Sequence, residues 1–291
     1  MARLRDRRPE NVAGDLYVDA SCIDCDTCRW MAPTVFRRDG DRSAVFAQPS
    51  TEADRLGALQ ALLSCPTGSI GTVNPPADMK AAQESLPIAL TDRVYHCGYH
   101  SRSSYGAASY LIQRPEGNVL VDSPRFIKPL VDRLEDLGGV RYLYLTHRDD
   151  VADHQKFRDH FQCDRLLHED DITADTRSVE LPLSGSEPIA LAPDLTIIPV
   201  PGHSRGHTVL LYENRVLFTG DHLCWSVSQQ QLIGFRDFCW YSWPEQMRSM
   251  ARLRDYRFEW VLPGHGKRFH ADAEQMQQEL QRCLAWMPTV A

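Results

Sequence analysis

The spacing of four cysteines constrains the fold of this chain more than any other feature. Cys22, Cys25 and Cys28 are each three positions apart, and Cys65 follows much later, directly before Pro66. At this spacing three thiolates can face the inside of one tight loop, while a fourth has to return from elsewhere in the fold. We therefore expect a small unit over residues 11–70, in which all four sulfurs converge on one object.

The Cys-x2-Cys-x2-Cys run and the distant Cys-Pro pair resemble the single-cluster 4Fe–4S ferredoxins. In two-cluster ferredoxins the run occurs twice, and the fourth Cys of each run binds the other cluster. This chain has one run, so the resemblance implies one 4Fe–4S cluster bound by four residues: Cys22, Cys25, Cys28 and Cys65. A structural zinc site is the alternative, but such sites usually pair two Cys-x2-Cys units, which this run fits poorly.

The overall charge and hydropathy exclude some classes of partner. The 291 residues carry a formal net charge of −7, which argues against a nucleic-acid partner because phosphate binding usually needs a basic face. No stretch reaches the roughly 18–20 apolar residues that span a bilayer, and the charged first residues lack the apolar run of a secretory signal. We expect a soluble protein of the cytoplasm, or of the plastid stroma, without a membrane or nucleic-acid partner.

Apolar runs that alternate with charged helical segments predict a second, larger unit over residues 87–291. Residues 71–86 are predicted to be a linker, since Pro75-Pro76 breaks any regular element. We expect strands over residues 15–19, 119–121, 142–145, 195–200 and 216–219, and helices over residues 54–63, 129–137 and 244–253. This order predicts an α+β chain whose second unit has sheets covered by helices.

Histidines and aspartates follow several of the expected strands, at the point where each strand ends. They lie on short loops that are rich in Gly, which permits tight turns and a close approach of the backbone to a bound ion. Imidazole and carboxylate groups on the loops of a rigid scaffold can converge on a metal. The five segments are Val121-Asp122-Ser123, the stretch from Thr146-His147 to Asp153-His154, Pro201-Gly202-His203, Gly220-Asp221-His222 and Pro263-Gly264-His265.

The second unit resembles the metallo-β-lactamase superfamily, and its glyoxalase II-like members most closely, in three motifs that occur in the family's order: Pro-Gly-His-x-x-Gly-His-Thr, Phe-Thr-Gly-Asp and Leu-Pro-Gly-His-Gly. The resemblance implies an αββα sandwich that follows the small ferredoxin-like domain. It also implies a site for two metals. His147 and His203 would bind the first metal, His265 would bind the second, and Asp221 would bridge both. Asp122 would support the metal-binding loop without binding a metal.

The first of these loops departs from the family's His-x-His-x-Asp-His pattern. Asp149 stands at the second His position, and an Asp-His pair occurs two residues later than in the family. A two-residue insertion explains this, with Asp149 or Asp150 as a ligand of the first metal and Asp153 and His154 as ligands of the second. A carboxylate in place of imidazole shifts the preference somewhat toward iron or manganese and away from zinc. The flavodiiron branch of the superfamily also has a carboxylate at this position.

Three functions are compatible with these two centres. The first is a metal-dependent hydrolase of a small-molecule ester, thioester, lactone or amide, with Asp221 and Asp153 as catalytic residues and zinc, iron or manganese as the two divalent metals. The second is an oxidoreductase similar to flavodiiron proteins, in which the cluster, served by a redox partner protein, delivers electrons to two irons. The third is a non-enzymatic electron-transfer or sensing protein, which only the altered loop supports. We rank hydrolysis slightly first. We expect segments 95–105 and 235–243, together with Trp225 and Arg236, to lie around the substrate pocket, because they flank the ligand loops.

Overall fold

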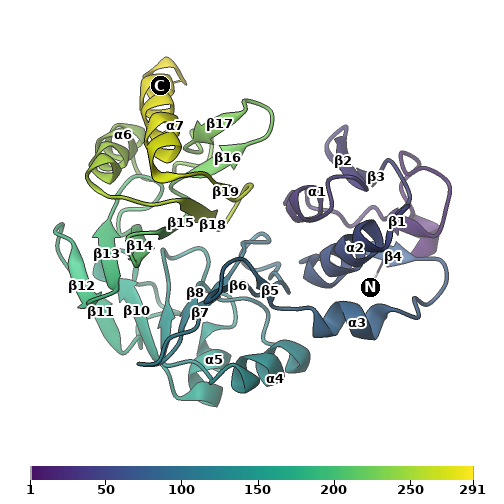
Figure 1. Ribbon diagram of the computed structural model, residues 1–291, viewed down its shortest axis with the longest axis horizontal. Helices are drawn as coiled ribbons and strands as arrows, with labels where there is room; N and C mark the ends of the chain where they lie inside the picture. The colour runs from purple at the N-terminus through teal and green to yellow at the C-terminus, as the bar shows by residue number, and fades with distance from the viewer. Residues whose placement is uncertain (1, 291) are drawn as a thin grey trace.

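The first unit of the computed structural model, which describes residues 2–290, folds around the four cysteines (Figure 1). Its elements are the 3-10 helix η1 (Leu4–Asp6), β1 (Leu16–Val18), α1 (Thr27–Met31), β2 (Phe36–Asp39), β3 (Arg42–Val45), α2 (Glu52–Ser64) and β4 (Ile70–Thr72). Strand β1 pairs with β4 and β2 pairs with β3, both antiparallel. Apolar side chains from these strands and from α2 form one core, which includes Cys28 and Cys65.

Helix α2 fixes the place of the fourth sulfur. It begins with a capping box, in which the Thr51 side chain accepts from the Asp54 backbone N–H and the Asp54 carboxylate accepts from the Thr51 N–H. These two bonds satisfy donors that a helix start otherwise leaves unpaired. Ala58 and Ala61 are buried on the face that packs against the core. The helix expected over residues 54–63 is confirmed, and Cys65 follows directly at its end.

The segment predicted as a linker contains a helix of its own. Helix α3 (Met79–Glu84) follows the Pro75-Pro76 pair, which ends the extended chain after β4. The preceding Asp78 accepts hydrogen bonds from Arg55 of α2 at 2.9 and 3.0 Å, so this segment is held against the first unit. The division of the chain at residues 70 and 87 stays a prediction.

The second unit contains two sheets. In the seven-stranded sheet the strands follow the order β11 (Leu181–Leu183), β10 (Asp164–His168), β9 (Tyr142–Tyr144), β8 (Val119–Val121), β7 (Tyr110–Ile112), β6 (Val94–His96) and β5 (Ile88–Ala89). In the six-stranded sheet the order is β12 (Ile189–Ala192), β13 (Leu195–Pro199), β14 (Thr208–Tyr212), β15 (Val216–Gly220), β18 (Trp260–Pro263) and β19 (Phe269–His270). A separate antiparallel pair consists of β16 (Cys224–Ser226) and β17 (Gln231–Ile233).

The two sheets pack face to face and carry helices on their outer faces (Figure 1). Buried residues such as Tyr144 of the first sheet and Phe218 of the second share the core between them. The covering helices are α4 (Lys128–Asp136) and α5 (His154–Phe161) on the first sheet, and α6 (Trp243–Arg252) and α7 (Ala273–Trp286) on the second; the short 3-10 helices are η2 (Glu169–Asp171), η3 (Leu253–Asp255) and η4 (Met287–Val290). The expected αββα sandwich is confirmed. Among residues 2–290, no helix has the length and apolar character that crossing a membrane requires.

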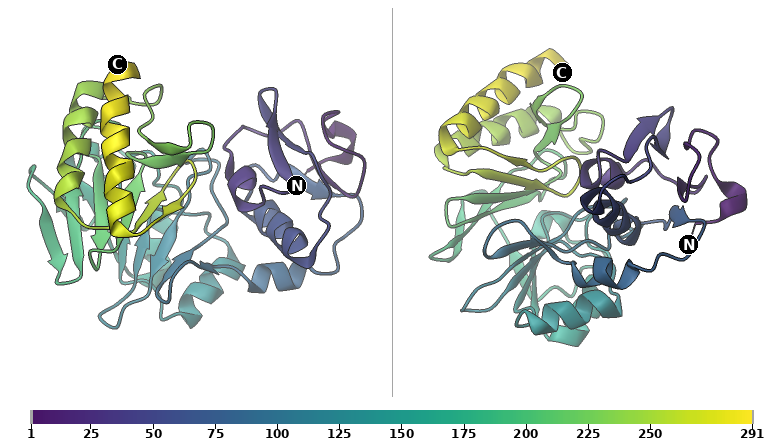
Figure 2. Two further views of the ribbon diagram at one scale, coloured as in Figure 1. Left: turned by 45° about the horizontal axis from the view of Figure 1, so that its top comes forward. Right: turned by 45° about the vertical axis from the view of Figure 1, so that its right-hand side comes forward.

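Parallel strand pairs bring the ligand loops to one edge of the sandwich. Strands β8 and β9 pair in parallel, as do β15 and β18, so the carboxyl ends of each pair lie side by side. Asp122 follows β8, His147 follows β9, Asp221 follows β15 and His265 follows β18. The views in Figure 2 show the first unit, purple to blue, lying against one side of this sandwich.

Candidate metal and cluster centres

The four cysteines line one small cavity inside the first unit. The loop after β1, the first turn of α1 and the end of α2 supply them: Cys22, Cys25, Cys28 and Cys65. Asp24 and Asp26 have the left-handed φ values of 62° and 59°, which tighten the loop between the first three. The structure thus brings together the four sulfurs that the sequence spacing predicts to converge.

The surroundings of these sulfurs fit a bound cluster. Burial raises the pKa of the Cys25 thiol to about 12 and that of Cys28 well above its usual value, so their thiolates need a cationic partner such as iron. The Ser69 backbone N–H donates to Cys65 Sγ at 3.3 Å, and the Thr27 hydroxyl oxygen lies 3.5 Å from Cys25 Sγ. Hydrogen bonds of this kind tune the reduction potential of an iron–sulfur cluster.

A segment of the second unit packs directly on the cluster loop. Gly106 has a φ of 93°, and a Cβ on it would lie 2.8 Å from Cys25 Cβ and 3.1 Å from Cys25 Sγ. The hydroxyl of the neighbouring Tyr105 donates to the carbonyl of Ile23, which lies between Cys22 and Cys25 in the loop. The backbone can approach the cluster ligand this closely only because Gly106 has no side chain.

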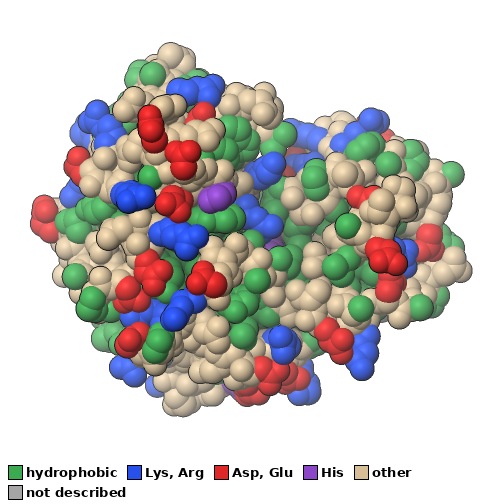
Figure 3. Space-filling model, viewed as in Figure 1, with side chains coloured by type: hydrophobic (Ala, Val, Ile, Leu, Met, Phe, Trp, Pro, Cys, Tyr) green, Lys and Arg blue, Asp and Glu red, His purple; other side chains and the backbone are tan. Residues whose placement is uncertain are grey.

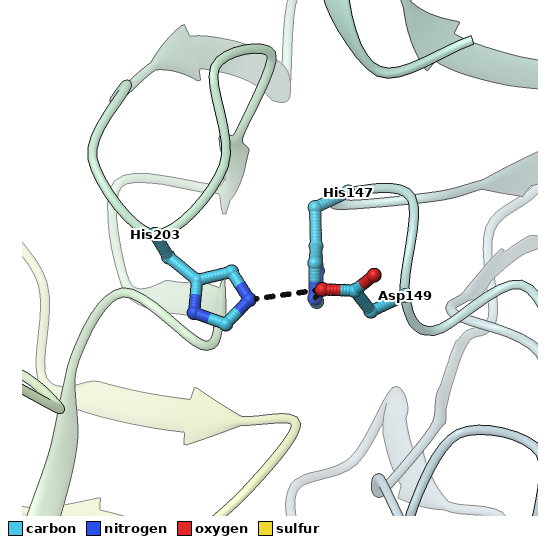
Figure 4. Close-up of side chains that lie close together, drawn as sticks. All are labelled: His147, Asp149 and His203. Carbon is cyan, nitrogen blue, oxygen red and sulfur yellow. Dashed lines mark hydrogen bonds and ion pairs between the residues drawn. The ribbon is translucent and has the colours of Figure 1, made fainter. Parts of the chain in front are cut away.

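One group of side chains on the ligand loops consists of His147, Asp149 and His203, whose ligand atoms all lie within 4.8 Å of one another (Figure 4). Asp149 Oδ2 lies 3.3 Å from His203 Nε2 and 3.8 Å from His147 Nε2. The loop after β9 supplies His147 and Asp149, and the loop between β13 and β14 supplies His203. Two imidazoles and a carboxylate at this separation can hold one divalent cation.

A second group lies beside the first and shares His147 with it; its other members are Asp150 and Asp221. Asp221 Oδ1 accepts from His265 Nδ1 at 2.8 Å, while Asp221 Oδ2 lies 3.8 Å from His147 Nε2 and 3.7 Å from His203 Nε2. Burial acts to raise the pKa of Asp221, but the surrounding imidazoles outweigh it and hold this pKa well below its usual range. One carboxylate oxygen faces each group, which is the geometry a bridging ligand needs.

Unpaired buried atoms show that these residues fit a metal. Both oxygens of Asp150, Nε2 of His147 and Nε2 of His265 are buried without a hydrogen-bond partner. Burial raises the pKa of Asp150 well above its usual value, because an unpaired carboxylate in a buried place is costly. Gly264 leaves the space open, since a Cβ there would lie 2.7 Å from Asp150 Oδ2. A divalent cation would satisfy these atoms, and the His–carboxylate set suits zinc, iron or manganese.

Asp153 and His154, which we expected to bind the second metal, belong to neither group. Asp153 precedes α5 with a left-handed φ of 48°. Its Oδ2 accepts from the Phe126 backbone N–H at 2.9 Å, and its Oδ1 lies 2.6 Å from Lys156 Nζ. The structure therefore does not bring Asp153 and His154 to either group, and Asp150 lies in the second group where they were expected.

His154 belongs to a different network beneath α5. Its Nδ1 lies 3.0 Å from Nη1 of Arg165, a buried guanidinium whose Nε donates to Glu180 at 2.9 Å. An imidazole nitrogen that accepts from a buried arginine anchors the helix to strand β10. The two-residue insertion in the loop is consequently unnecessary, since Asp149 and Asp150 face one cation position each.

Asp122 supports the ligand loop from below, in the role that the family resemblance implies. Its Oδ1 accepts from the Thr146 backbone N–H at 2.8 Å and from the Thr146 hydroxyl at 3.0 Å. That hydroxyl also lies 2.9 Å from His147 Nδ1. Asp122 therefore acts on the candidate metal ligand His147 through Thr146, and it fixes the direction in which Nε2 points.

Replacing Asp122 with asparagine is expected to weaken metal affinity by about 10–100-fold, as for other residues that orient a ligand. The amide cannot accept from both the backbone N–H and the hydroxyl of Thr146 with the strength of a carboxylate. Competition with a chromophoric chelator measures the affinity. The matched control is Asp136→Asn at the exposed end of α4, which should leave the affinity unchanged. Equal affinities for the two variants would show that Asp122 does not orient the site.

A cavity of about 860 Å³ opens above the metal centre and is lined by both units. From the second unit come His203, Asp221 and His265, together with the aromatic side chains of Tyr105, Phe235, Phe238 and Trp240. From the first unit come Asp24, Cys25, Asp26, Arg29 and Arg38. In the space-filling view, apolar and basic side chains lie along the seam between the units (Figure 3).

The expectation for the pocket lining is met only in part, because Tyr105, Phe235, Phe238 and Trp240 line the cavity whereas Trp225 and Arg236 do not. The lining from the first unit was not predicted. Asp26 is the clearest of these missed residues, because its Oδ1 is buried without a partner while its carboxyl faces the cavity. No motif in either unit encodes how the two pack together, so the sequence held no signal for it.

Comparison with known proteins defines the class of each unit. Residues 18–72 match a family model described as the 4Fe-4S single cluster domain of Ferredoxin I. Solved structures of metallo-β-lactamases share the fold of the second unit. Residues 18–72 are thus similar to a single-cluster 4Fe–4S domain, and the second unit has the fold of the metallo-β-lactamases.

The proteins that the chain is similar to include two metallo-β-lactamases and one uncharacterized protein. The DIM-1 metallo-β-lactamase, in a structure exposed to ceftazidime, is 17% identical, with a TM-score of 0.54 over 70% of this chain and 96% of its own. The FIM-1 metallo-β-lactamase from Pseudomonas aeruginosa, in a mono-zinc form, is 16% identical, with a TM-score of 0.51 over 68% of this chain and 93% of its own. The uncharacterized protein YmaE of Bacillus subtilis (strain 168) is 26% identical over 163 residues. That match covers 54% of this chain and 60% of YmaE, which is less than two thirds of the relative's length.

Proposed function

We propose that this protein is a metal-dependent hydrolase that cleaves an ester, thioester, lactone or amide bond of a small molecule. The observation that carries the proposal is the convergence of imidazoles and carboxylates at the floor of a cavity large enough for a substrate. The proposed ligands are His147, Asp149, Asp150, His203, Asp221 and His265. The metallo-β-lactamase fold, and the zinc form of one neighbour, support the same class of chemistry.

The proposed ligands surround two cation positions. We assign His147, Asp149 and His203 to the first position. We assign Asp150 and Asp221, which form a group with His147, to the second, together with His265, which contacts Asp221 Oδ1. Asp221 Oδ2 lies toward His203. Bound divalent metals would make water a nucleophile at neutral pH and polarise the carbonyl oxygen. Hydrolysis adds the hydroxyl of water to the acyl carbon, breaks the bond to the leaving oxygen, sulfur or nitrogen, and delivers a proton to that leaving atom. The cavity walls hold the acyl compound over the centre.

A substrate panel tests this proposal. Protein loaded with zinc or manganese should hydrolyse at least one class among aryl esters, thioesters and lactones, lose that activity on chelation, and regain it when metal is returned. The metal content of the same sample is measured alongside the rate. Absence of hydrolysis in every class, in samples whose two metal positions are filled, would contradict a hydrolase.

A second candidate function, a cluster-coupled di-iron oxidoreductase, rests on a specific contact between the two centres. Cys25 lines the same cavity as Asp221 and His265. Tyr105 joins them more closely, because its hydroxyl bonds the cluster loop while its ring lies 6.2 Å from the ring of His265. The carboxylates at the metal centre suit iron.

Electron flow distinguishes this candidate from the first. In iron-loaded protein, a cluster reduced by dithionite, after removal of excess dithionite, should be reoxidised by O2 or NO. Each cluster gives one electron, so four reduced chains and four protons would convert one O2 to two waters, and two reduced chains and two protons would convert two NO to N2O and water. Reoxidation should be much slower in protein whose second centre holds zinc. Equal rates for the iron-loaded and zinc-loaded forms would leave hydrolysis as the function.

A further inference from the structure

A row of aromatic side chains leads from the metal centre to the mouth of the cavity. The rings of Phe238 and Trp240 lie 5.9 Å apart, and the ring of Trp240 lies 6.3 Å from that of His203. Phe235 extends the row, with its ring 6.2 Å from Phe238. Phe238 and Trp240 are 53% and 58% exposed. Large apolar side chains gathered at this exposure usually mark a surface that binds something.

Backbone hydrogen bonds fix this row to the metal-binding loop. The Trp240 and Tyr241 N–H groups both donate to the His203 carbonyl, at 2.9 and 3.1 Å, and the Ser242 N–H donates to the Gly202 carbonyl at 3.0 Å. The Cys239 thiol also contacts the Gly202 carbonyl, at 3.1 Å. The segment therefore cannot move away from the metal centre without breaking the bonds that hold His203, so the aromatic wall is a preformed part of the site.

The part of the cavity lining that comes from the first unit is charged. Asp24 there lies between two guanidinium groups, with Arg29 Nη1 at 2.5 Å and Arg38 Nη2 at 3.1 Å. These ion pairs come from the first unit and line the same cavity as the aromatic row. An apolar group that enters gains by contact with Phe238 and Trp240, and it would lose by covering the ion pairs. The aromatic lining therefore favours the apolar part of a substrate, whereas the charged lining disfavours it.

We infer that the substrate carries a bulky apolar group, aromatic or branched, close to the bond that is cleaved, and that Trp240 and Phe238 bind this group. The inference rests on the proposed hydrolase function for the identity of the bond. Because the ring of Trp240 lies 6.3 Å from that of His203, the apolar group lies beside the reacting carbonyl. Small acyl compounds such as acetyl esters leave the aromatic wall uncovered and are poor substrates.

Binding of two product-like carboxylates to zinc-loaded protein tests the inference without relying on turnover. Phenylacetate should bind at least about tenfold more tightly than acetate, because it buries a Phe-sized group. Trp240→Ala and Phe238→Ala should each lose most of this preference. The matched control is Tyr241→Ala, which removes an adjacent aromatic residue that is 49% exposed and does not line the cavity; it should keep the preference. Isothermal titration calorimetry measures all four proteins.

A kinetic comparison of phenylacetyl and acetyl thioesters accompanies the titrations. If neither thioester is hydrolysed, the proposed function is weakened for this substrate class, whereas the titrations still decide the inference. Equal affinity of the wild type for phenylacetate and acetate would overturn it. A preference that survives in both Trp240→Ala and Phe238→Ala would overturn it as well. If Trp240→Ala fails to fold, Phe238→Ala decides the question, because the backbone of Phe238 makes none of the hydrogen bonds to the metal-binding loop.

Discussion

Replacing Asp221 with asparagine is expected to lower kcat/KM for hydrolysis by more than about 100-fold, the largest loss usual for residues that merely orient a ligand. The reason is that its two oxygens face the two cation positions, one toward His265 and the other toward His147 and His203. An amide has a single oxygen and no charge, so it cannot serve both. The brown colour of the cluster should remain, because Asp221 contacts none of the four cysteines.

Metal analysis and rate measurements on the same sample check this prediction. The matched control is Asp159→Asn on the exposed face of α5, which should retain both metals and activity. Simultaneous loss of the colour and of the activity in Asp221→Asn would point to misfolding. Unchanged activity in a folded variant that keeps the brown colour of the cluster would contradict the bridging role of Asp221.

Replacing Cys28 with alanine is expected to remove the cluster and to unfold much of the first unit. Cys28 is buried in the same core as the strands and α2, so the cluster it helps to bind is part of what that core packs around. Bound metal centres of small domains contribute folding free energy outright, and this unit has few apolar residues to replace it. Iron and sulfide per chain should fall to near zero, and the thermal unfolding curve should gain an early transition.

The control for this variant is Cys163→Ala, which removes a buried thiol outside the cluster cavity. It should keep its iron and sulfide. The proposed hydrolase activity should also weaken in Cys28→Ala, because the loop that carries Cys25, Asp26 and Arg29 lines the cavity above the candidate metal centre. A Cys28→Ala protein that still holds four irons and four sulfides per chain would contradict the assignment of the cluster ligands.

Most of the fold was predictable from the sequence because its signals are local. The run of cysteines, the apolar spacing of the helix expected over residues 54–63, and the apolar stretches at β8, β9, β13 and β15 each act over a few positions. The motifs around His203, Asp221 and His265 lie at strand ends, and parallel pairing brings such ends together. These parts of the site therefore followed from the order of motifs along the chain.

The loop after β9 was misread because its outcome depends on tertiary contacts. Asp153-His154 has the residue types of a ligand pair, but the backbone N–H of Phe126 binds the aspartate and buried Arg165 contacts the histidine. Neither partner is close in sequence. Asp150 reaches the metal centre because Gly264 leaves room beside it, and that complementarity exists only once β9 and β18 have been placed.

The packing of the two units against each other could not be predicted from the sequence either. Gly106, which approaches Cys25, lies 81 positions from it and looks like any loop glycine in the sequence. The cavity that Cys25 shares with Asp221 and His265 adjoins this contact, and its charged lining comes from the first unit. How two separately folded units pack depends on the shapes of their surfaces, and the pattern of residues along the chain does not encode these shapes.

Native mass spectrometry of the protein purified without oxygen tests the central claim most directly, because it counts every metal bound to one chain. The account predicts a mass of the chain plus four irons, four sulfides and two further divalent metals, with the last two reduced or lost in Asp221→Asn and the cluster retained. A folded chain that carries no metal beyond the cluster, or that carries zinc at the cysteines without sulfide, would contradict it.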